Sequence, residues 1–293
     1  MTRSTAWSRF ASQRTALISL VVLVTLLTAC LLTLGWSHDA MRQTDLSVAR
    51  QAPSLTYLFG TDELGRSLLA RSLYGGAVSL VLGVLAAAIA IVFGTAYGLI
   101  SGYFGGRLDG LLMRIVDVLY ALPSLLLVML LTVGLGPRLE AIPGVGREVA
   151  RLLVLAVAIG GVSWLSVARV VRGQVLSLRE QPYVEAARAM GIGPIGIIWR
   201  HLTPGIIGPV IVFATLTVPQ AILQESFLSF LGVGVQAPQA TWGSLAADGV
   251  RVLGPYGFDW WLLVFPAVLL SVTLLALHFV GDGLRDALEA RTR

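Results

Sequence analysis

The sequence contains no lysine, so all 21 of its basic residues are arginines. This absence excludes chemistry that needs a lysine amine, including a Walker A phosphate loop and a Schiff-base site. The single cysteine, Cys30, excludes an internal disulfide and any CxxC redox or zinc motif. The three histidines, His38, His201 and His278, lie far apart, with no metal-ligand spacing between them. We therefore expect neither catalytic chemistry nor a bound metal on this chain.

Charged residues are also scarce: they make up 13% of the 293 residues, whereas hydrophobic residues make up 56%. A water-soluble globule of this size needs more polar groups on its surface, so the composition predicts a membrane protein. A helix needs about 20 apolar residues to cross the hydrocarbon core. The stretches that contain no Asp, Glu or Arg, each bounded by Arg, Asp, Glu or His, are 15–37, 72–106, 118–137, 152–168, 202–224, 226–247 and 260–281.

Six of these stretches are predicted to be membrane-spanning helices. The stretch 226–247 is interrupted by Gly232, Gly234, Pro238 and Gly243, so we predict a surface or re-entrant segment there. The stretch 72–106 is longer than one span requires. The glycine pairs at its two ends restrict the predicted helix to about 77–101.

Arginine placement predicts the orientation, because short cytoplasmic loops retain positive charge. With the N-terminus in the cytoplasm, 13 arginines lie on the cytoplasmic side and eight outside, which favours both termini inside. Residues 27–30 offer an alternative, because Leu-Thr-Ala-Cys is typical of a lipoprotein signal. The chain stays apolar after Cys30, however, and this favours an ordinary helix residue at that position.

Small residues recur at every fourth position of the second predicted span. This spacing places them on one face of the helix, where two helices can approach closely in lipid. The stripe is therefore predicted to be a packing face, either within this subunit or between two subunits. Its members are Ala86, Ala90, Gly94, Gly98 and Gly102.

The loop between the fourth and fifth predicted spans, residues 172–203, contains a short amphipathic segment. Pro182 suits a first helical turn, and Gly191 with the pair Gly193 and Pro194 predicts the end of the helix. We expect Tyr183, Ala186, Ala187 and Met190 on one face, and Glu185 and Arg188 on the other. A helix of about two turns is not stable alone in water. It is therefore expected either to dock on a partner or to lie on lipid headgroups.

Several motifs, found in the same order along the chain, resemble those of one known family. Glu185-Ala186-Ala187, followed by Gly191 and then Pro204, resembles the EAA loop of permease subunits of bacterial ATP-binding cassette (ABC) importers. Other segments narrow the resemblance to the dipeptide, oligopeptide and nickel importer family, and to the second permease of its heterodimeric pair. These segments are 59–66 (FGTDELGR), 102–106 with Asp109, Met113-Arg114 and Asp117, 176–180, 183–188, 228–234, Trp242-Gly243 and 281–288.

The resemblance implies an all-α membrane fold of the type I ABC importer kind, with six spans and both termini inside. It implies a cytoplasmic tail and first span at 1–36, an external segment at 37–74, and a five-helix core at 75–293 with the EAA loop at 172–205. The external segment is either part of a docking surface for a binding protein or an ordinary solvated loop. The expected location is the bacterial inner membrane.

The resemblance also implies the partners and the residues that couple this chain to them. The partners are a homologous second permease, two ABC ATPase subunits that bind ATP and Mg²⁺, and an external solute-binding protein that delivers a di- or oligopeptide. No cofactor is expected on this chain, and no nucleic acid, since the net charge of +5 forms no stripe. The alternatives are a permease for nickel or another small solute, and a self-contained secondary transporter or channel. The coupling residues would be Tyr183, Glu185, Ala186, Ala187, Arg188 and Gly191.

Overall fold

The computed structural model describes residues 6–142, 144, 146–252 and 259–289. In those ranges the regular structure is helical, apart from one antiparallel bridge between Thr61 and Ser67. The shorter helices are α1 (Ala6–Ser12), α3 (Leu34–Ala40), η1 (Leu46–Val48), α8 (Pro182–Ala189), α9 (Pro194–Ile197), η2 (Ile198–Leu202) and α11 (Trp242–Val252). The longer helices are α2 (Arg14–Leu32), α4 (Leu68–Phe104), α5 (Gly106–Tyr120), α6 (Ser124–Glu140), α7 (Arg147–Arg179), α10 (Thr203–Phe230) and α12 (Trp260–Glu289).

Within the described ranges, five helical segments are long and apolar enough to cross a membrane. A bent pair, α5 and α6, raises the number of candidate spans to six if the pair counts as one. The composition-based prediction of a helical membrane protein is confirmed. The five segments are Arg14–Leu32, Leu68–Phe104, Arg147–Arg179, Pro194–Phe230 and Trp260–Leu288.

The third predicted span, 118–137, is not one straight helix. Helix α5 ends at Tyr120, α6 begins at Ser124, and the two axes differ by 91°. Pro123 has no N–H to continue the hydrogen-bond ladder of α5, and it disfavours the helical conformation at Leu122. The uncharged run predicted the apolar character of this region, but Pro123 divides it.

The predicted limits of the second span were wrong, because α4 continues through Gly75 and Gly76. A Cβ atom at Gly76 would lie 2.5 Å from the ring of Trp242 and 2.7 Å from the sulfur of Cys30. The Trp242 indole is buried and donates its N–H to the carbonyl of Ser72, at 2.9 Å. Gly76 thus leaves space for the Trp242 ring and Gly75 for the backbone of Thr241, whose atoms would lie 3.2 Å from an added Cβ, and neither glycine ends the helix. Cys30 is buried in the same apolar cluster as Trp242, as expected of an ordinary residue of α2.

Helices α4 and α7 form the most extensive contact of the described structure. The small-residue stripe of α4 lies along this contact: Ala86 and Ala90 are fully buried, and a Cβ at Gly98 would lie 2.6 Å from the carbonyl oxygen of Ala168. Gly94 and Gly102 approach Val167 and Val175 of α7 equally closely. The stripe therefore packs within this subunit, so that the two backbones can approach each other.

The predicted non-spanning segment 226–247 begins five residues too early, because the candidate span Pro194–Phe230 includes 226–230; no candidate span covers residues 231–247, as the glycines and Pro238 predicted. Helix α10 ends at Phe230, an irregular segment follows, and α11 begins at Trp242. Glu225, which is fully buried, holds this region together. Its Oε1 atom accepts hydrogen bonds from the hydroxyls of Ser229 (2.6 Å) and Thr241 (2.7 Å).

We expect Glu225→Gln to fold nearly as stably as the wild type, because the amide oxygen can still accept both hydrogen bonds. Glu225→Leu leaves two buried hydroxyls without this acceptor, and should lower the free energy of unfolding by about 2 kcal/mol or more. Thermal unfolding of the two variants in detergent measures the difference. Equal losses in both variants would contradict this role of the acceptor oxygen.

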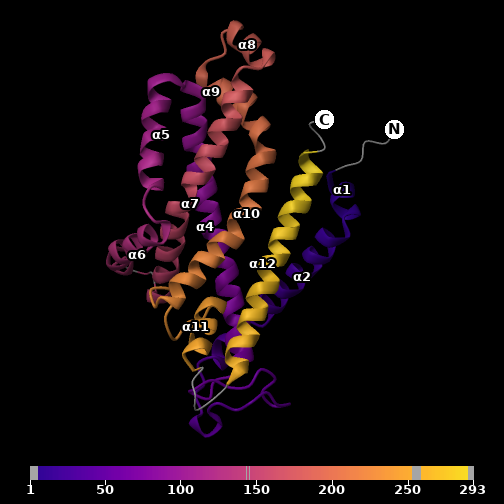
Figure 1. Cartoon of the computed structure of the whole chain (residues 1–293), viewed down its shortest axis with the longest axis vertical. Coiled ribbons are helices and arrows are strands. Elements are labelled where there is room, and N and C mark those ends of the chain that lie inside the picture. The colour runs from indigo at the N-terminus through magenta and orange to yellow at the C-terminus, as the bar shows by residue number, and fades with distance from the viewer. Residues whose placement is uncertain (1–5, 143, 145, 253–258, 290–293) are drawn as a thin grey trace.

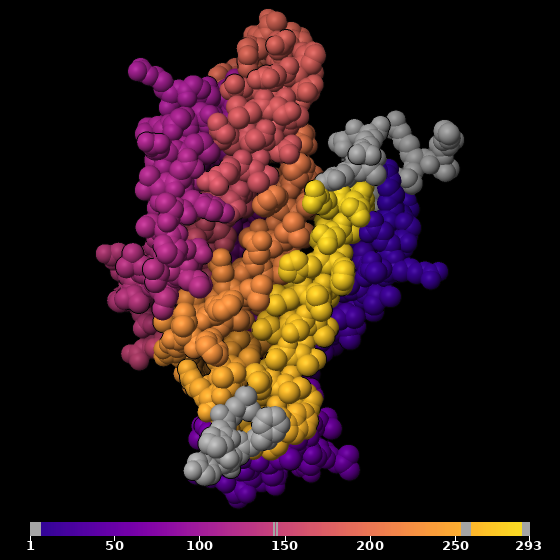
Figure 2. Space-filling view, viewed as in Figure 1, coloured from indigo at the N-terminus to yellow at the C-terminus, as the bar shows by residue number. Residues whose placement is uncertain are grey.

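The long helices run between the two ends of the molecule (Figure 1). Helix α8 lies at one end, and α2 starts and α12 ends on the side nearer to α8, without reaching as far. The segment between α3 and α4 lies at the opposite end, and α11 lies near it. Figure 2 shows α12 beside α2 along one side of the bundle, which agrees with their extensive contact.

Candidate functional site

Helix α8 begins and ends where the sequence predicts. Pro182 occupies its first turn, and Gly191 follows its C-terminus with a φ of 80°. The N–H of Ile192 donates to the carbonyl of Ala187 (3.1 Å), and the N–H of Gly191 donates to that of Arg188 (3.0 Å). This pair of bonds is a Schellman motif, which satisfies carbonyls left open at a helix end.

One face of α8 packs on the rest of this chain. Val184 and Ala187 are fully buried, and Val184 belongs to an apolar cluster with Val175 of α7 and Leu202 of η2. The amphipathic pattern predicted one face for Tyr183, Ala186, Ala187 and Met190; these positions are neighbours around the helix, but Ala187 is buried whereas the other three are exposed. Ala187 packs inward because the helix is fixed to its own bundle by the Val184 face, which the amphipathic pattern did not reveal.

The opposite face of α8 is exposed, and Tyr183 on it contacts the His201 ring, with the ring centroids 6.5 Å apart. We call Tyr183, Glu185, Ala186, Arg188 and Met190 the α8 surface; all five are exposed. Met190 is 74% exposed, an unusual state for a large apolar side chain on a helix that protrudes from the bundle. The next turns expose two more such side chains, Ile195 and Trp199.

Helix α8 is firmly connected to two long helices. It follows α7 after only Glu180 and Gln181, and α9 and η2 lead from it into α10. The Leu178 side chain of α7 packs on Gly205 of α10, where an added Cβ atom would lie 2.8 Å from it. A force on α8 would therefore reach both α7 and α10 through packed contacts.

An ion cluster adds α5 to this connection. The Asp109 carboxylate of α5 accepts from both Nε (2.5 Å) and Nη2 (2.6 Å) of Arg172 on α7. It also accepts from the hydroxyl of Ser101 on α4, at 2.5 Å. Arg179 donates to the carbonyl of Gly102, at 3.0 Å. Bidentate arginine–carboxylate geometry of this kind fixes orientation as well as distance. The ends of α4, α5 and α7 nearest α8 are thus held as one unit.

A pair of glycines tests how α8 ends. Gly191→Ala meets no atom within 4 Å, but it places a side chain at a φ of 80°, which costs about 1–2 kcal/mol. Gly193→Ala is the matched control, because Gly193 is equally open and has an ordinary φ of −70°. We expect about tenfold faster hydrogen exchange at the α8 amides in the first variant only. Equal exchange in both variants would show that the left-handed geometry is not required.

A second candidate region is a polar cavity of about 270 Å³ between α7, α10 and the break that joins α5 to α6. Thr217, Gln220 and Gln224 of α10 line it, and their spacing places them on one helix face. The Oε1 atom of Gln224 is buried and has no hydrogen-bond partner. Polar groups inside a membrane-spanning bundle are costly and mark functional positions. The other polar lining residues are Tyr120, Ser124, Ser163 and Ser166.

This cavity was not predicted from the sequence. The signal was present, because Thr217, Gln220 and Gln224 recur at helical spacing in an otherwise apolar stretch. A search for charged residues passed over neutral hydrogen-bonding ones.

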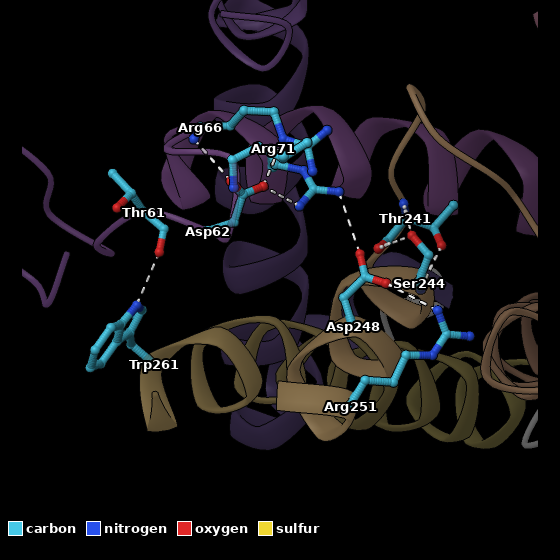
Figure 3. Close-up of polar contacts among 10 residues, drawn as sticks. Thr61, Asp62, Arg66, Arg71, Thr241, Ser244, Asp248, Arg251 and Trp261 are labelled. Carbon is cyan, nitrogen blue, oxygen red and sulfur yellow. Dashed lines mark hydrogen bonds and ion pairs between the residues drawn. The ribbon is translucent and has the colours of Figure 1, made fainter. Parts of the chain in front are cut away.

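At the opposite end, the motif at 59–66 forms a rigid turn. A Cβ at Gly65, where φ is 70°, would lie 1.8 Å from the carbonyl oxygen of Asp45, so only glycine fits there. The carboxylate of Asp62 accepts from the backbone N–H groups of Leu64 and Arg66, both at 2.9 Å. It also accepts from the side chains of Arg66 and Arg71, both at 2.7 Å (Figure 3). Asp62 thus organises the entry into α4.

The described residues contain no group of three or more His, Cys, Asp or Glu that could hold a metal ion. The two acidic side chains near α11 contact other groups of this chain. Glu225 accepts from the hydroxyls of Ser229 and Thr241, and Asp248 lies beside Arg71 and Arg251. The spanning helices, the exposed α8 surface and the polar cavity between α7 and α10 are together the features of a multi-pass membrane transport subunit.

Comparison with known proteins gives the family. The family described as the binding-protein-dependent transport system inner membrane component matches residues 94–293. The dipeptide transport system permease protein DppC of Bacillus subtilis (strain 168) is 43% identical, over 98% of this chain and 85% of its own length. The oligopeptide transport system permease protein OppC of Escherichia coli (strain K12) is 44% identical, over 97% of this chain and 90% of its own length. This chain belongs to that family of inner membrane permease components, as its motifs predicted.

A solved structure supports the fold independently. A chain of the MetNI methionine ABC transporter, determined in inward-facing conformations, superposes with a TM-score of 0.56 at 22% identity. The match covers 77% of this chain and 98% of the other. The helical arrangement is therefore that of an ABC importer permease.

Proposed function

We propose that this chain forms one half of the membrane path of an ATP-driven importer for di- or oligopeptides. The observation that carries the proposal is the exposed α8 surface. It lies on a helix whose other face, at Val184 and Ala187, is packed against the bundle, so a partner bound to this surface is in contact with the bundle. The names of the relatives DppC and OppC support peptides as the substrate class. The other half of the path is a homologous permease.

In this proposal α8 is the contact for the ATPase subunits, which bind ATP and Mg²⁺. Glu185 and Arg188 offer charges of both signs, and Tyr183, Ala186 and Met190 offer apolar contact area. Buried Ala187 fixes the helix to its own chain, and Gly191 turns the chain toward α9. Opening and closure of the ATPase pair would move α8, and α7 and α10 with it.

The proposed topology follows from the position of α8. Because ATP is a cytoplasmic substrate, the α8 end faces the cytoplasm, and the start of α2 and the end of α12 share that side (Figure 1). The bent pair α5 and α6 then forms one crossing, the third along the chain, and brings the total to the six of a type I architecture. An external binding protein would deliver the peptide at the end that carries residues 41–67.

The cavity between α7 and α10 is proposed to be part of the peptide path. The amide groups of Gln220 and Gln224 can donate to and accept from a peptide backbone, whatever its side chains are. Neutral groups also avoid a strong preference for one substrate charge. This chemistry suits an importer that handles peptides of varied sequence.

Replacing Gln224 should therefore reduce uptake. We expect Gln224→Leu to lower peptide uptake severalfold, because it removes a buried acceptor from the path. The control is Thr132→Val, which removes a hydroxyl bonded to the Val128 carbonyl of its own helix. Radiolabelled dialanine uptake into proteoliposomes measures both variants. Equal uptake by the two would remove Gln224 from the path.

The test of the function itself is uptake by the reconstituted complex. The chain is co-expressed with its second permease and the ATPases, placed in proteoliposomes, and supplied with the binding protein and labelled dialanine. Uptake that requires both ATP and the binding protein supports the proposal. Uptake by this chain alone, driven by a proton or sodium gradient, would overturn it. Uptake of nickel but not of peptide would overturn the proposed substrate.

A further inference from the structure

A cavity with a strongly charged wall lies at the end of the molecule opposite α8. It holds about 490 Å³, between the turn at residues 62–66, the start of α4, the end of α10, and α11. Its wall carries three carboxylates and three guanidinium groups, so the two signs balance. These groups are Asp62, Glu63, Asp248, Arg66, Arg71 and Arg251.

Most of the buried charge in this wall is already paired. Asp62 is 5% exposed and accepts from four donors, as described above. Arg71 is 4% exposed, and its Nη1 atom donates to Asp62 at 2.7 Å. The Nε atom of Arg71, however, is buried and has no hydrogen-bond partner. A buried guanidinium N–H without a partner is costly, and it marks a position where a ligand can be accommodated.

Two further charged groups at the mouth are held only loosely. Asp248 lies 3.5 Å from Nη2 of Arg71 and 3.7 Å from Nη1 of Arg251 (Figure 3). Both distances exceed the usual range of a hydrogen bond, and the side chains of Asp248 and Arg251 are 49% and 63% exposed. Each group can therefore exchange its present partner for a ligand group at little cost.

We propose that this cavity is a receiving site for a short zwitterionic peptide. The peptide carboxylate binds Arg251 and Arg71, and the peptide ammonium group binds Asp248. The balance of charge favours a ligand with both signs over an anion or a cation. A concave site of this volume suits a small ligand, whereas protein partners bind flatter and larger surfaces.

The position of the cavity fits transfer into the membrane path. Ser229 of α10 lines it, and Ser229 lies five residues from Gln224, which is about 7.5 Å along the helix axis and about 140° around it. A peptide released at the outer end would thus meet charged groups first and neutral amides next. This inference rests on the proposed function, because it takes a peptide as the ligand.

The test is cysteine protection in the complete transporter. Gln236, which is exposed and lines the cavity, is replaced by cysteine and labelled with a membrane-impermeant maleimide. Leu55→Cys is the control, because Leu55 is 98% exposed at the same end and outside the cavity. The native Cys30 is buried and should not label. The ligands are dialanine and its N-acetylated, C-amidated form, which is similar in size but uncharged.

We expect millimolar dialanine to slow labelling at position 236 at least threefold, and the blocked form to have no effect. Asp248→Asn in the same background should abolish this protection, and position 55 should label equally throughout. Equal protection by both peptides, or by neither, would overturn the proposal. Protection by the peptide-free binding protein alone, with no added effect of dialanine, would instead identify a protein-docking surface. Dialanine uptake by the same preparation reports separately on the proposed function.

Discussion

Replacing Ala186 with tryptophan is expected to abolish ATP-driven transport, with at least a tenfold loss of uptake. Ala186 is exposed on α8, so the larger side chain meets nothing inside this chain and should leave its fold intact. Packed interfaces do not accept a large added volume at their centre. The bulky ring would therefore prevent the ATPase subunits from approaching α8.

The control for Ala186→Trp is Ala186→Ser, which adds only one hydroxyl group at the same exposed position. Both variants should reach the membrane at wild-type levels, and only the first should lose uptake. Transport-coupled ATP hydrolysis is measured beside uptake. Unimpaired coupling in Ala186→Trp would contradict the assignment of α8 as the ATPase contact.

The second large effect is expected at the contact between α4 and α7. An alanine normally stabilises a helix interior relative to glycine by about 0.5–1 kcal/mol. At Gly98 the added Cβ would lie 2.6 Å from a backbone oxygen of α7, which cannot move without separating the helices. We therefore expect Gly98→Ala to destabilise by about 1–3 kcal/mol, the cost of overpacking. The same change at Gly94, Gly98 and Gly102 together should prevent folding.

Gly173→Ala provides the control for that contact. Gly173 is inside α7 and exposed, and nothing lies within 4 Å of its added Cβ, so the helix propensity of alanine should dominate. Thermal unfolding in detergent should show a lower midpoint for Gly98→Ala and an equal or higher midpoint for Gly173→Ala. A change of the same sign in both variants would contradict the close-packing explanation.

Local signals in the sequence predicted much of the fold. Long apolar stretches predicted the spanning helices, because a membrane requires continuous apolar length. Pro182 and Gly191 predicted the limits of α8, because a first-turn proline and a left-handed glycine act within one turn of the chain. Such effects need no knowledge of distant segments.

The errors arose where distant segments decide the structure. The glycine pair at residues 75–76 resembles a helix break, but Thr241 and the ring of Trp242, far along the chain, occupy the space that Gly75 and Gly76 provide. Ala187 has the same local chemistry as Ala186, yet only Ala187 packs on the bundle beside Val184. The cavity at Gln224 requires three helices to converge, and residue spacing within one helix does not show that.

The most direct test of the central claim is a cross-link between α8 and an ATPase subunit. Ala186→Cys is prepared beside Leu55→Cys, with the buried Cys30 replaced by alanine in both. Each cysteine carries a short photoreactive group, and the assembled complex is illuminated and separated by mass. We predict an adduct between this chain and an ATPase subunit from position 186 and none from position 55. An intact complex in which position 186 forms no such adduct, or position 55 does, would contradict the account.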